Sequence, residues 1–261
     1  MTTLIKRNNW QVWKDVVFAL FVREIRTGFN DKFGLAWAVI NPVVFIFALA
    51  YGRSLISGPE THSMPGFTFM ALGLLMIQLF LEVLNNTSNA IKKNKALYAF
   101  RQVQPISGII ASGVFQLLVK LVAMLVIALL MFLMGIELRF DNPLLMLSNI
   151  LMLWLIAMSI GCTFAIMACY VEEMQKVLSL LSRPLFFISC VFFSLQDVPR
   201  EYWPYLNWNP IAHAIELTRY GAYTSYGLEG VSQLFLAMCT LTTVFLACCS
   251  YFASWKQAIS R

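Results

Sequence analysis

The sequence predicts an all-α integral membrane protein with six transmembrane helices, and three observations lead to that fold class. Of the 261 residues, 59% are hydrophobic and only 12% are charged, which is less charge than the surface of a soluble domain carries. Apolar runs close to the ~17–25 residues of a membrane helix recur along the chain. Lys and Arg gather in alternate connections between these runs. We expect a cytoplasmic interfacial segment at 1–34 and a six-span transmembrane domain at 35–261.

Residues 1–34 show no signal-peptide pattern and predict an amphipathic helix in the surface of the membrane. Its apolar residues share one arc: Trp10, Trp13, Val17, Leu20, Phe21 and Ile25. Arg23 and Arg26 lie on the opposite arc, where they can reach lipid phosphates of the inner leaflet. The alternative is an amphipathic helix docked on soluble protein.

Six apolar runs are expected to cross the membrane. They cover 35–55, 67–84, 107–134, 144–169, 177–196 and 231–253. Of the 19 Lys and Arg, 14 fall on one side of this arrangement, four fall on the other, and Lys120 lies inside a span. An excess of basic residues marks the cytoplasmic side. Six crossings and this bias predict that both termini are cytoplasmic.

The segment 187–219 runs from the end of an apolar run into a stretch rich in aromatic residues. Tyr202, Trp203, Tyr205 and Trp208 are closely spaced, and such rings favour the boundary between membrane and water. We expect two short helical pieces that lie at the outer face or dip back into it, which is tolerated where protein or a water-filled path covers the backbone. The alternative is an interfacial anchor with no role in passage.

His213, Glu216 and Arg219 follow Pro210 at steps of three, so a helix that begins at Pro210 places them on one side. Glu216 can pair with Arg219 or with His213. We therefore expect a paired site in which exchanging the two charges restores part of the function lost in single variants. A solvated helix face is the alternative, because exposed ion pairs are weak.

Lys120 lies about 13 residues into the third apolar run, ~20 Å at 1.5 Å per residue. A lysine at that depth suggests a functional site facing a cavity or a partner carboxylate. Snorkelling of its long side chain to the surface is the alternative. Glu82 lies near the cytoplasmic end of the second run and can reach the headgroups.

The connection 85–105 is the longest on the cytoplasmic side, and it predicts a short helix over 89–98. Ile91, Leu97 and Tyr98 give that helix an apolar edge beside basic and polar residues. The segment as a whole is a candidate docking element for a soluble partner, and its residues are Ile91, Lys92, Lys93, Asn94, Lys95, Leu97 and Tyr98. A solvated basic loop that only sets topology is the alternative.

The sequence contains no recognisable catalytic chemistry. It lacks a phosphate-binding loop of the G-x-x-x-x-G-K-[ST] type, and its two histidines, His62 and His213, have no nucleophile partner in sequence. We expect His62 to be solvated. All six cysteines lie inside apolar runs without metal-ligand spacing, and no basic run is long enough for nucleic acid. Catalysis would have to come from another chain.

Three stretches resemble the membrane subunits of bacterial ABC exporters of capsular polysaccharide, which are type-2 ABC permeases. They are LFVREIRTGF…GLAWAVINP at 20–42, AIKKNKALYAFRQVQPI at 90–106, and EEMQKVLSLLSRPLFFISCVFFSLQDVPREYWPYLNWNPIAHAIELTR at 172–219. The EMQKVL and WNP-x-x-H-x-x-E-x-x-R patterns are the most specific. The resemblance covers nearly the whole chain.

The resemblance implies a homodimer with two cytoplasmic ABC ATPase subunits, in the bacterial inner membrane. ATP and Mg would bind to the ATPase, and this chain would hold no cofactor. The substrate would be a lipid-linked polysaccharide, passed on to a periplasmic adaptor and an outer-membrane exporter. The loop at 89–98 would be the coupling element, and 198–219 would shape the channel exit. Sugar rings stack on aromatic walls, so candidate channel residues are Trp37, Tyr51, Lys120, Tyr202, Trp203, Tyr205, Trp208, His213, Glu216 and Arg219.

Other functions stay open at this point. The same machine could export O-antigen or teichoic acid. A small-molecule or drug ABC permease, or a passive channel, would belong to a different class. The sequence does not specify the sugar repeat, the lipid anchor or the adaptor.

Overall fold

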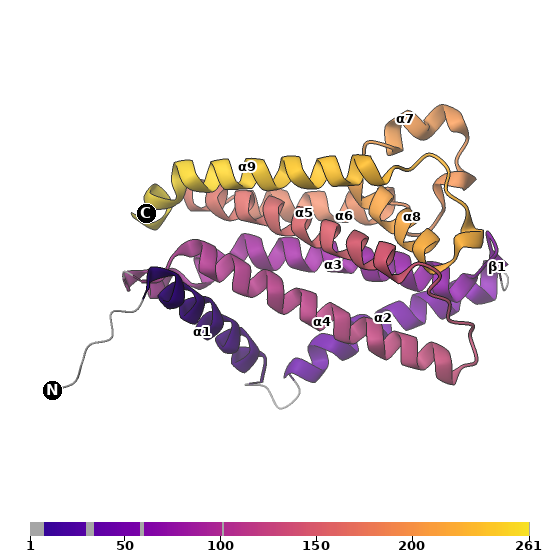
Figure 1. The fold of residues 1–261 in the computed structure, drawn as a ribbon, viewed down its shortest axis with the longest axis horizontal. Coiled ribbons are helices and arrows are strands. Elements are labelled where there is room, and N and C mark those ends of the chain that lie inside the picture. The colour runs from indigo at the N-terminus through magenta and orange to yellow at the C-terminus, as the bar shows by residue number, and fades with distance from the viewer. Residues whose placement is uncertain (1–7, 30–33, 58–59, 101, 261) are drawn as a thin grey trace.

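The computed structural model describes residues 8–29, 34–57, 60–100 and 102–260, which form a bundle of helices (Figure 1). Five helices in that part are long and apolar enough to cross a membrane. They are α2 (Gly34–Ser57), α3 (Gly66–Lys93), α4 (Pro105–Leu133), α5 (Pro143–Tyr170) and α9 (Gln233–Ser260). The prediction of an all-helical membrane protein is therefore confirmed at this level.

Proline and asparagine fix where several helices begin. Pro105, Pro143 and Pro210 occupy the first turn of α4, α5 and α8 (Pro210–Ala222), where a missing N–H costs no helical hydrogen bond. Asn142 accepts a hydrogen bond from the N–H of Leu145, 3.3 Å away, and Asn209 accepts one from Ile211 at 3.0 Å. These side chains satisfy donors that the first helical turn leaves free.

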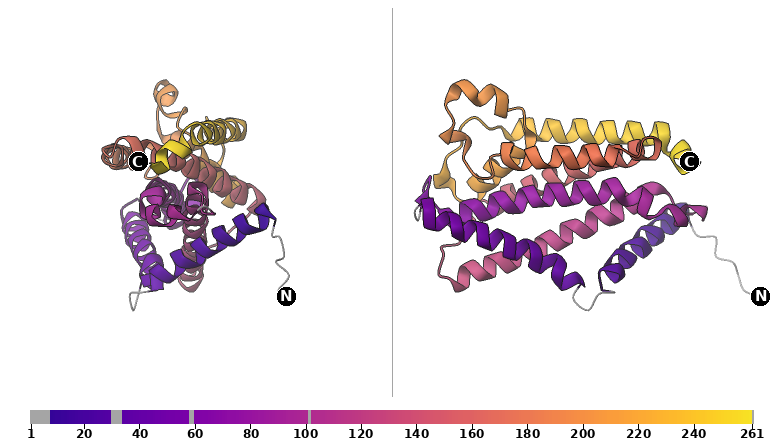
Figure 2. Two further views of the ribbon diagram at one scale, coloured as in Figure 1. Left: turned by 90° about the vertical axis from the view of Figure 1, so that its left-hand side faces the viewer. Right: turned by 180° about the vertical axis from the view of Figure 1, so that it is seen from behind.

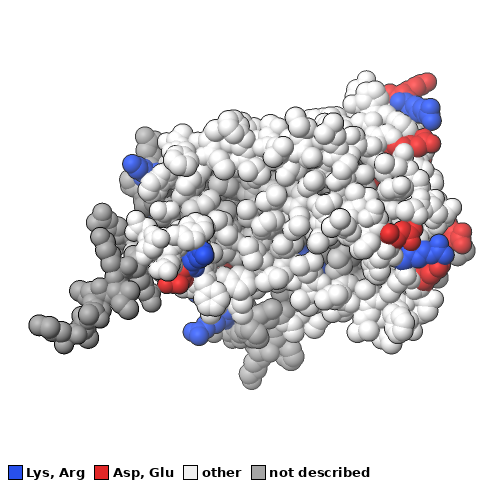
Figure 3. Space-filling view, viewed as in Figure 1, with Lys and Arg blue, Asp and Glu red and all other residues white. Residues whose placement is uncertain are grey.

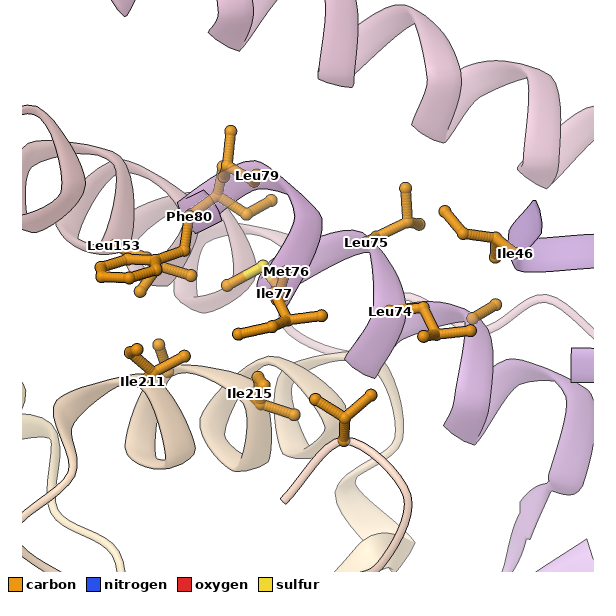
Figure 4. Close-up of a cluster of buried hydrophobic side chains, with 14 of the residues drawn as sticks. Ile46, Leu74, Leu75, Met76, Ile77, Leu79, Phe80, Leu153, Ile211 and Ile215 are labelled. Carbon is orange, nitrogen blue, oxygen red and sulfur yellow. The ribbon is translucent and has the colours of Figure 1, made fainter. Parts of the chain in front are cut away.

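Helix α3 is the centre of the bundle. Its membrane-depth part is almost completely buried, because α2, α4, α5 and α8 all pack against it. In Figure 4, α3 side chains meet Ile211 and Ile215 of α8, with Leu153 of α5 and Ile46 of α2 nearby. This burial also explains why α3 extends beyond the predicted run: Thr87 and Ser88 are buried, and the helix ends only at Lys93.

The predicted run 177–196 is not a spanning helix by itself. The structure has α6 (Met174–Ile188), whose 15 residues give ~22 Å, short of the ~30 Å apolar core of a bilayer. Pro184 lies inside α6, and Cys190 has φ +57°, the left-handed region that most residues avoid. The chain therefore leaves the helical path before it reaches the other face.

The stretch after α6 forms short pieces at one end of the bundle. They are η2 (Leu195–Asp197), η3 (Arg200–Tyr202), α7 (Trp203–Leu206), α8, and η4 (Thr224–Tyr226). A two-residue antiparallel pair, β1 (Glu60–Thr61) and β2 (Met64–Pro65), lies at the same end (Figure 1). We call this end of the bundle the hairpin end. There, His62 Nε2 lies 2.7 Å from Asp197 Oδ1. His62 is partly exposed, as the sequence suggests, and it also has a carboxylate partner.

The opposite end is basic. We call it the basic end and define it by Lys92, Lys93, Lys95 and Lys256, at the ends of α3 and α9 and in η1 (Lys95–Ala99). Helix α1 (Asn9–Phe29) begins at this end and packs on α4, and both α1 and α2 slant away from the bundle axis (Figure 2). Figure 3 shows charged side chains at the two ends of one face, with an almost uncharged surface between them. An uncharged band of this kind is what the apolar core of a bilayer requires of the protein surface that it contacts.

Candidate functional site

Arg219 of α8 is the best-satisfied charge in the part of the chain that the structure describes. Its side chain is fully buried. Nη1 donates to the carbonyl oxygen of Cys190 at 2.8 Å and to Glu216 Oε1 at 3.0 Å, while Nη2 donates to Val191 O at 2.8 Å. Nε donates to Phe69 O at 3.2 Å, and the guanidinium lies 3.6 Å from the centre of the Phe69 ring. Arg219 therefore joins α3, α8 and the break after α6.

Glu216 is held by donors on every side. Its Oε2 accepts from the hydroxyl of Tyr226 at 2.7 Å and from Ser194 at 3.3 Å. Its Oε1 accepts from Arg219 and from the N–H of Leu195 at 3.4 Å. Buried ionised groups persist only with such partners. Burial also raises the pKa of the Tyr226 hydroxyl, so that group stays a donor.

His213 does not pair with Glu216, although the sequence leaves that pairing open. The N–H of Ser232 donates to His213 Nδ1 at 3.0 Å, and His213 Nε2 lies 2.7 Å from the carbonyl oxygen of Asn207. Because Nδ1 accepts, the proton sits on Nε2 and the ring is neutral. The imidazole thus joins α8 to the start of α9 and to the turn after α7.

The three α8 side chains are buried, not solvated: His213 is 3% exposed, Glu216 2% and Arg219 0%. The alternative of a solvated helix face is therefore wrong. These residues do not form an open wall either, because each is enclosed by its own chain. Together with Tyr226, Ser194 and Phe69 they make a network, here called the α8 network, that fixes the irregular backbone at the hairpin end.

The predicted channel aromatics fall into two separate groups. Tyr202, Tyr205 and Trp208 are exposed around α7, whereas Trp203 is half-buried, and its Nε1 donates to Val198 O at 2.8 Å. Trp37 and Tyr51 are also exposed, but they lie on α2. Helices α7 and α2 are on opposite sides of the bundle in Figures 1 and 2. One chain alone therefore does not bring all six aromatics to one surface.

A cavity of about 400 Å³ lies between α5, α6 and the first turn of α8. Its walls are mostly apolar and include Phe80, Ile156 and Leu185, with Tyr205 and Trp208 at its side. Asn209, which also lines it, donates to the hydroxyl of Ser189 at 3.1 Å. An apolar cavity with a few fixed polar groups suits an amphipathic molecule better than an ion.

Lys120 is 4% exposed and pairs with Glu82, whose carboxylate lies 2.7 Å from Nζ; Gln78 Oε1 lies 3.1 Å away. Of the two interpretations, the structure supports a partner carboxylate over snorkelling. The pair joins α4 to α3 at membrane depth. Its Glu82 side is about one-third exposed, which leaves this carboxylate within reach of the surface of the bundle.

The connection 89–98 is not a separate helix. Residues up to Lys93 continue α3, and η1 follows, because Asn94 departs from helical geometry and caps α3 (φ −103°, ψ 7°). Ile91 is buried, Leu97 and Tyr98 are not fully covered, and the side chains of Lys92, Lys93 and Lys95 point away from the core. The apolar edge is thus turned partly into the chain's own core, and the basic side chains face outward.

This connection is tied to α1 by polar contacts. Asn94 Oδ1 accepts from Arg23, and Lys93 pairs with Glu24 of α1. Arg26 is exposed, whereas Arg23 is only partly exposed. Burial raises the pKa of the Tyr98 hydroxyl. A cavity of about 180 Å³ lies beside η1, and Lys92, Tyr98, Glu172 and Gln175 are among the residues that line it.

Several members of these sites escaped the sequence analysis. Tyr226 and Ser194 bond to Glu216 but are far from it in sequence, and Glu24 lies on α1 without a partner that its spacing would reveal. Asn94 is different, because it belongs to the docking element predicted from the sequence; what the sequence analysis missed is that Asn94 ends α3, although an asparagine amid lysines suggests a helix terminus. The other contacts arise from folding and leave no pattern in the sequence.

Comparisons with known proteins agree with this architecture. Residues 15–223 match the protein family described as ABC-2 type transporter. The chain is 35% identical over 248 residues to the polysialic acid transport protein KpsM of Escherichia coli, covering 94% of this chain and 95% of that protein.

More distant relatives also cover nearly the full chain. The capsule polysaccharide export inner-membrane protein CtrC of Neisseria meningitidis serogroup A is 22% identical over 237 residues, 90% of this chain and 89% of its own. The capsule polysaccharide export inner-membrane protein BexB of Haemophilus influenzae is 24% identical over 238 residues, 88% of this chain and 89% of its own.

Proposed function

The chain belongs to the ABC-2 type transporter family, and from that premise we propose that it is the membrane subunit of an ATP-driven exporter of lipid-linked capsular polysaccharide. The observation that carries the proposal is the full-length similarity to KpsM, at 35% identity over 94% of the chain. CtrC and BexB, two further relatives, are capsule polysaccharide export proteins by name. Such export fits a bundle with a broad uncharged band and charged ends.

We propose that the protein crosses the bacterial inner membrane six times, with the basic end in the cytoplasm. The five long helices account for five crossings. The sixth combines α6 with the irregular stretch up to α7, whose backbone carbonyls at Cys190 and Val191 are satisfied by Arg219. Internal partners of this kind are what irregular backbone needs at membrane depth. The excess of Lys and Arg at the basic end supports the orientation.

The working unit in this proposal is a homodimer bound to two ABC ATPase subunits, which hold ATP and Mg. The ATPase docks at the basic end, against Lys92, Lys93, Lys95, Leu97 and the cavity beside η1. Contacts from Arg23 and Glu24 to this connection would transmit ATPase movements to α1 at the inner leaflet. A periplasmic adaptor and an outer-membrane exporter would receive the polymer beyond the hairpin end.

Exposed aromatic rings supply the path in this proposal. Tyr205 and Trp208 flank the 400 Å³ cavity, and Trp37 and Tyr51 stand on the other side of the bundle. In a homodimer, the α2 surface of one subunit can face the α7 region of its partner, which would bring the two aromatic groups to one passage. Sugar C–H faces stack on such rings, and hydroxyls reach the polar tips.

The test is ATP-driven uptake of lipid-linked capsular polysaccharide into inverted inner-membrane vesicles that contain the chain and its ATPase. Leu97→Glu should abolish uptake and co-purification of the ATPase, because it puts a charge into the docking surface. Leu228→Glu, a matched change at an exposed residue of the hairpin end, should preserve both. Undiminished ATPase binding by the Leu97 variant would rule out the docking assignment. Vesicles that take up no glycolipid would rule out the function.

A further inference from the structure

Helix α6 differs from the other membrane-depth helices in how little of it is covered. Among its 15 residues only Leu178 is buried. The apolar side chains of Leu180, Leu181 and Phe187 are exposed, as expected of a helix against lipid or an apolar partner. The same helix also carries two cations, Lys176 and Arg183, and no acidic residue.

The cations lie on one stripe of that exposed surface. Lys176, Ser179 and Arg183 recur at steps of three and four residues, so they share one face of the helix, and all three are exposed. Lys176 is near the basic end. Arg183 is nine residues beyond Met174, the first residue of α6, which is about 13 Å along the axis. The stripe therefore leads from the basic end toward the middle of the membrane.

Arg183 differs from the other two deep cations in having no carboxylate. Lys120 has Glu82 at 2.7 Å, and Arg219 has Glu216 at 3.0 Å. Arg183 has no ion pair or hydrogen bond through its side chain among the described residues. Cations inside membrane segments are costly in hydrocarbon and almost always face a water-filled path or a counter-charge. The same arc of α6 also holds the exposed side chains of Leu180 and Phe187, so it suits a path that carries water and an anion beside apolar groups.

A second copy of the chain would not supply that anion. Across helices α2 to α6, α8 and α9, the acidic residues are Glu82 and Glu216, and both already pair with cations of their own chain. A facing subunit could line the other side of a water-filled path, but it would bring no spare carboxylate to the depth of Arg183. A mobile anion, on the polymer or on a lipid headgroup, is left to supply the counter-charge.

We propose that the α6 stripe lines the path of the exported polymer and that Arg183 is the residue of this path that binds anionic groups on the polymer. This inference rests on the proposed export function and adds a specificity-determining residue to it. Arg183 presents a planar fork of donors that matches a carboxylate or a phosphate. Ser179, one turn below, can accept a hydrogen bond from a sugar hydroxyl, because its own proton is donated to Lys176 O at 2.8 Å. Lys176 follows the exposed Glu172 and Glu173 by one turn, so Arg183 is the cation of the stripe that has no carboxylate near it among the described residues.

The first test measures export of two polymers on the same lipid anchor, polysialic acid and a neutral glucan, by the complete complex with its ATPase in vesicles. Arg183→Gln should lower uptake of polysialic acid about tenfold, the size of one lost charge-assisted hydrogen bond, and change uptake of the glucan less than about twofold. Arg183→Lys should retain most of the uptake of polysialic acid. Arg139→Gln, a matched change at an exposed arginine in the loop between α4 and α5, should leave the ratio of the two rates unchanged.

Each other result overturns the proposal. Equal losses for both polymers would mean that Arg183 only supports the structure. Unchanged rates for both, with a loss only when anionic lipids are removed from the vesicles, would mean that it binds lipid headgroups. If the wild-type complex exports neither polymer, the export function itself fails, and this inference fails with it.

A second measurement does not depend on transport. In the complex, with the native cysteines replaced, Arg183→Cys should react with a charged, water-soluble thiol reagent. Soluble polysialic acid fragments should slow that reaction several-fold, and dextran should not. Leu125→Cys, on the exposed surface of α4, should stay unreactive because it faces lipid. An unreactive Arg183→Cys, or equal protection by both sugars, would contradict the inference.

Discussion

Two short helices at membrane depth, α8 and α6, each carry an arginine, and the two arginines differ in burial and in hydrogen-bond partners. In α8, of 13 residues, Arg219 is fully buried and bonds to a carboxylate, three carbonyl oxygens and an aromatic ring. In α6, of 15 residues, Arg183 is exposed. The first arrangement holds an irregular backbone together, whereas the second offers a charge to a visiting anion. Both residues are arginines on short helices, so their partners decide the role.

The largest effect should come from breaking the α8 network. Glu216→Ala leaves Arg219 buried without its carboxylate, a loss of about 3–5 kcal/mol for a buried pair. The midpoint of unfolding in detergent should fall accordingly, with little folded protein recovered. Glu229→Ala, which removes an exposed partner of Arg200, should change stability by less than ~1 kcal/mol. Equal stability of the two variants would refute the structural role.

Exchanging the two charges should not rescue α8. The spacing in the sequence suggests that swapping Glu216 and Arg219 would restore part of the function, because a pair is kept. The structure predicts otherwise: a carboxylate at position 219 would face the carbonyl oxygens of Phe69, Cys190 and Val191, and oxygens repel it. The double variant Glu216→Arg, Arg219→Glu should be at least as unstable as Glu216→Ala in the same unfolding measurement. Recovery of wild-type stability would contradict this account.

A second test adds bulk beside Arg219 without changing any charge. A Cβ at Gly73 would lie 2.5 Å from Arg219 Nη2 and 3.0 Å from Val191 O, so Gly73→Ala should cost about 1–3 kcal/mol by overpacking. Gly52→Ala in α2 is the matched control, since nothing lies within 4 Å of its Cβ. It should be neutral or stabilise by ~0.4–1 kcal/mol. Unfolding midpoints that move together would contradict this packing.

A smaller effect should appear outside the membrane, where the loop before α5 meets η4. Asp141 Oδ2 accepts from the N–H of Thr224 at 2.8 Å and from its hydroxyl at 2.7 Å, which lowers the pKa of that carboxyl. Its stabilisation is therefore present above the unfolded pKa and is lost as pH falls through the folded value. Between about pH 5 and 3, the unfolding temperature should fall more in wild type than in Asp141→Asn. If the unfolding temperatures of wild type and Asp141→Asn fall in parallel with pH, the bonds from Thr224 to Asp141 do not stabilise the protein.

The smallest effect on stability is expected at Arg183. Because its side chain has no partner to lose among the described residues, Arg183→Gln should move the unfolding midpoint by an amount equivalent to less than ~0.5 kcal/mol. A large drop would place Arg183 in the same class as Arg219 and remove the contrast between α6 and α8. Thermal unfolding of the purified complex, beside wild type, measures this directly.

Local patterns in the sequence were enough to predict the membrane class, five long apolar helices and the helix after Pro210. Apolar length and loop charge report directly on the bilayer, and Pro and Asn mark helix starts locally. The same local spacing placed Glu216 and Arg219 on one side of a helix, and the structure confirms that they pair. The run 177–196 differs, because apolar composition does not reveal that Arg219, far along the chain, binds the carbonyls of Cys190 and Val191 outside helical geometry.

Which polar residues are satisfied, and by which partners, became clear only in the folded chain. There Lys120 meets its carboxylate, and His213 has backbone partners in place of Glu216. Folding also encloses Ile91 and separates the α2 aromatics from those around α7. None of this follows from spacing, because burial and hydrogen-bond partners come from elements distant in sequence. The same reason holds for Arg183: from the sequence it counts among the basic residues of the cytoplasmic side, and the packing around α6 shows that no described carboxylate reaches it.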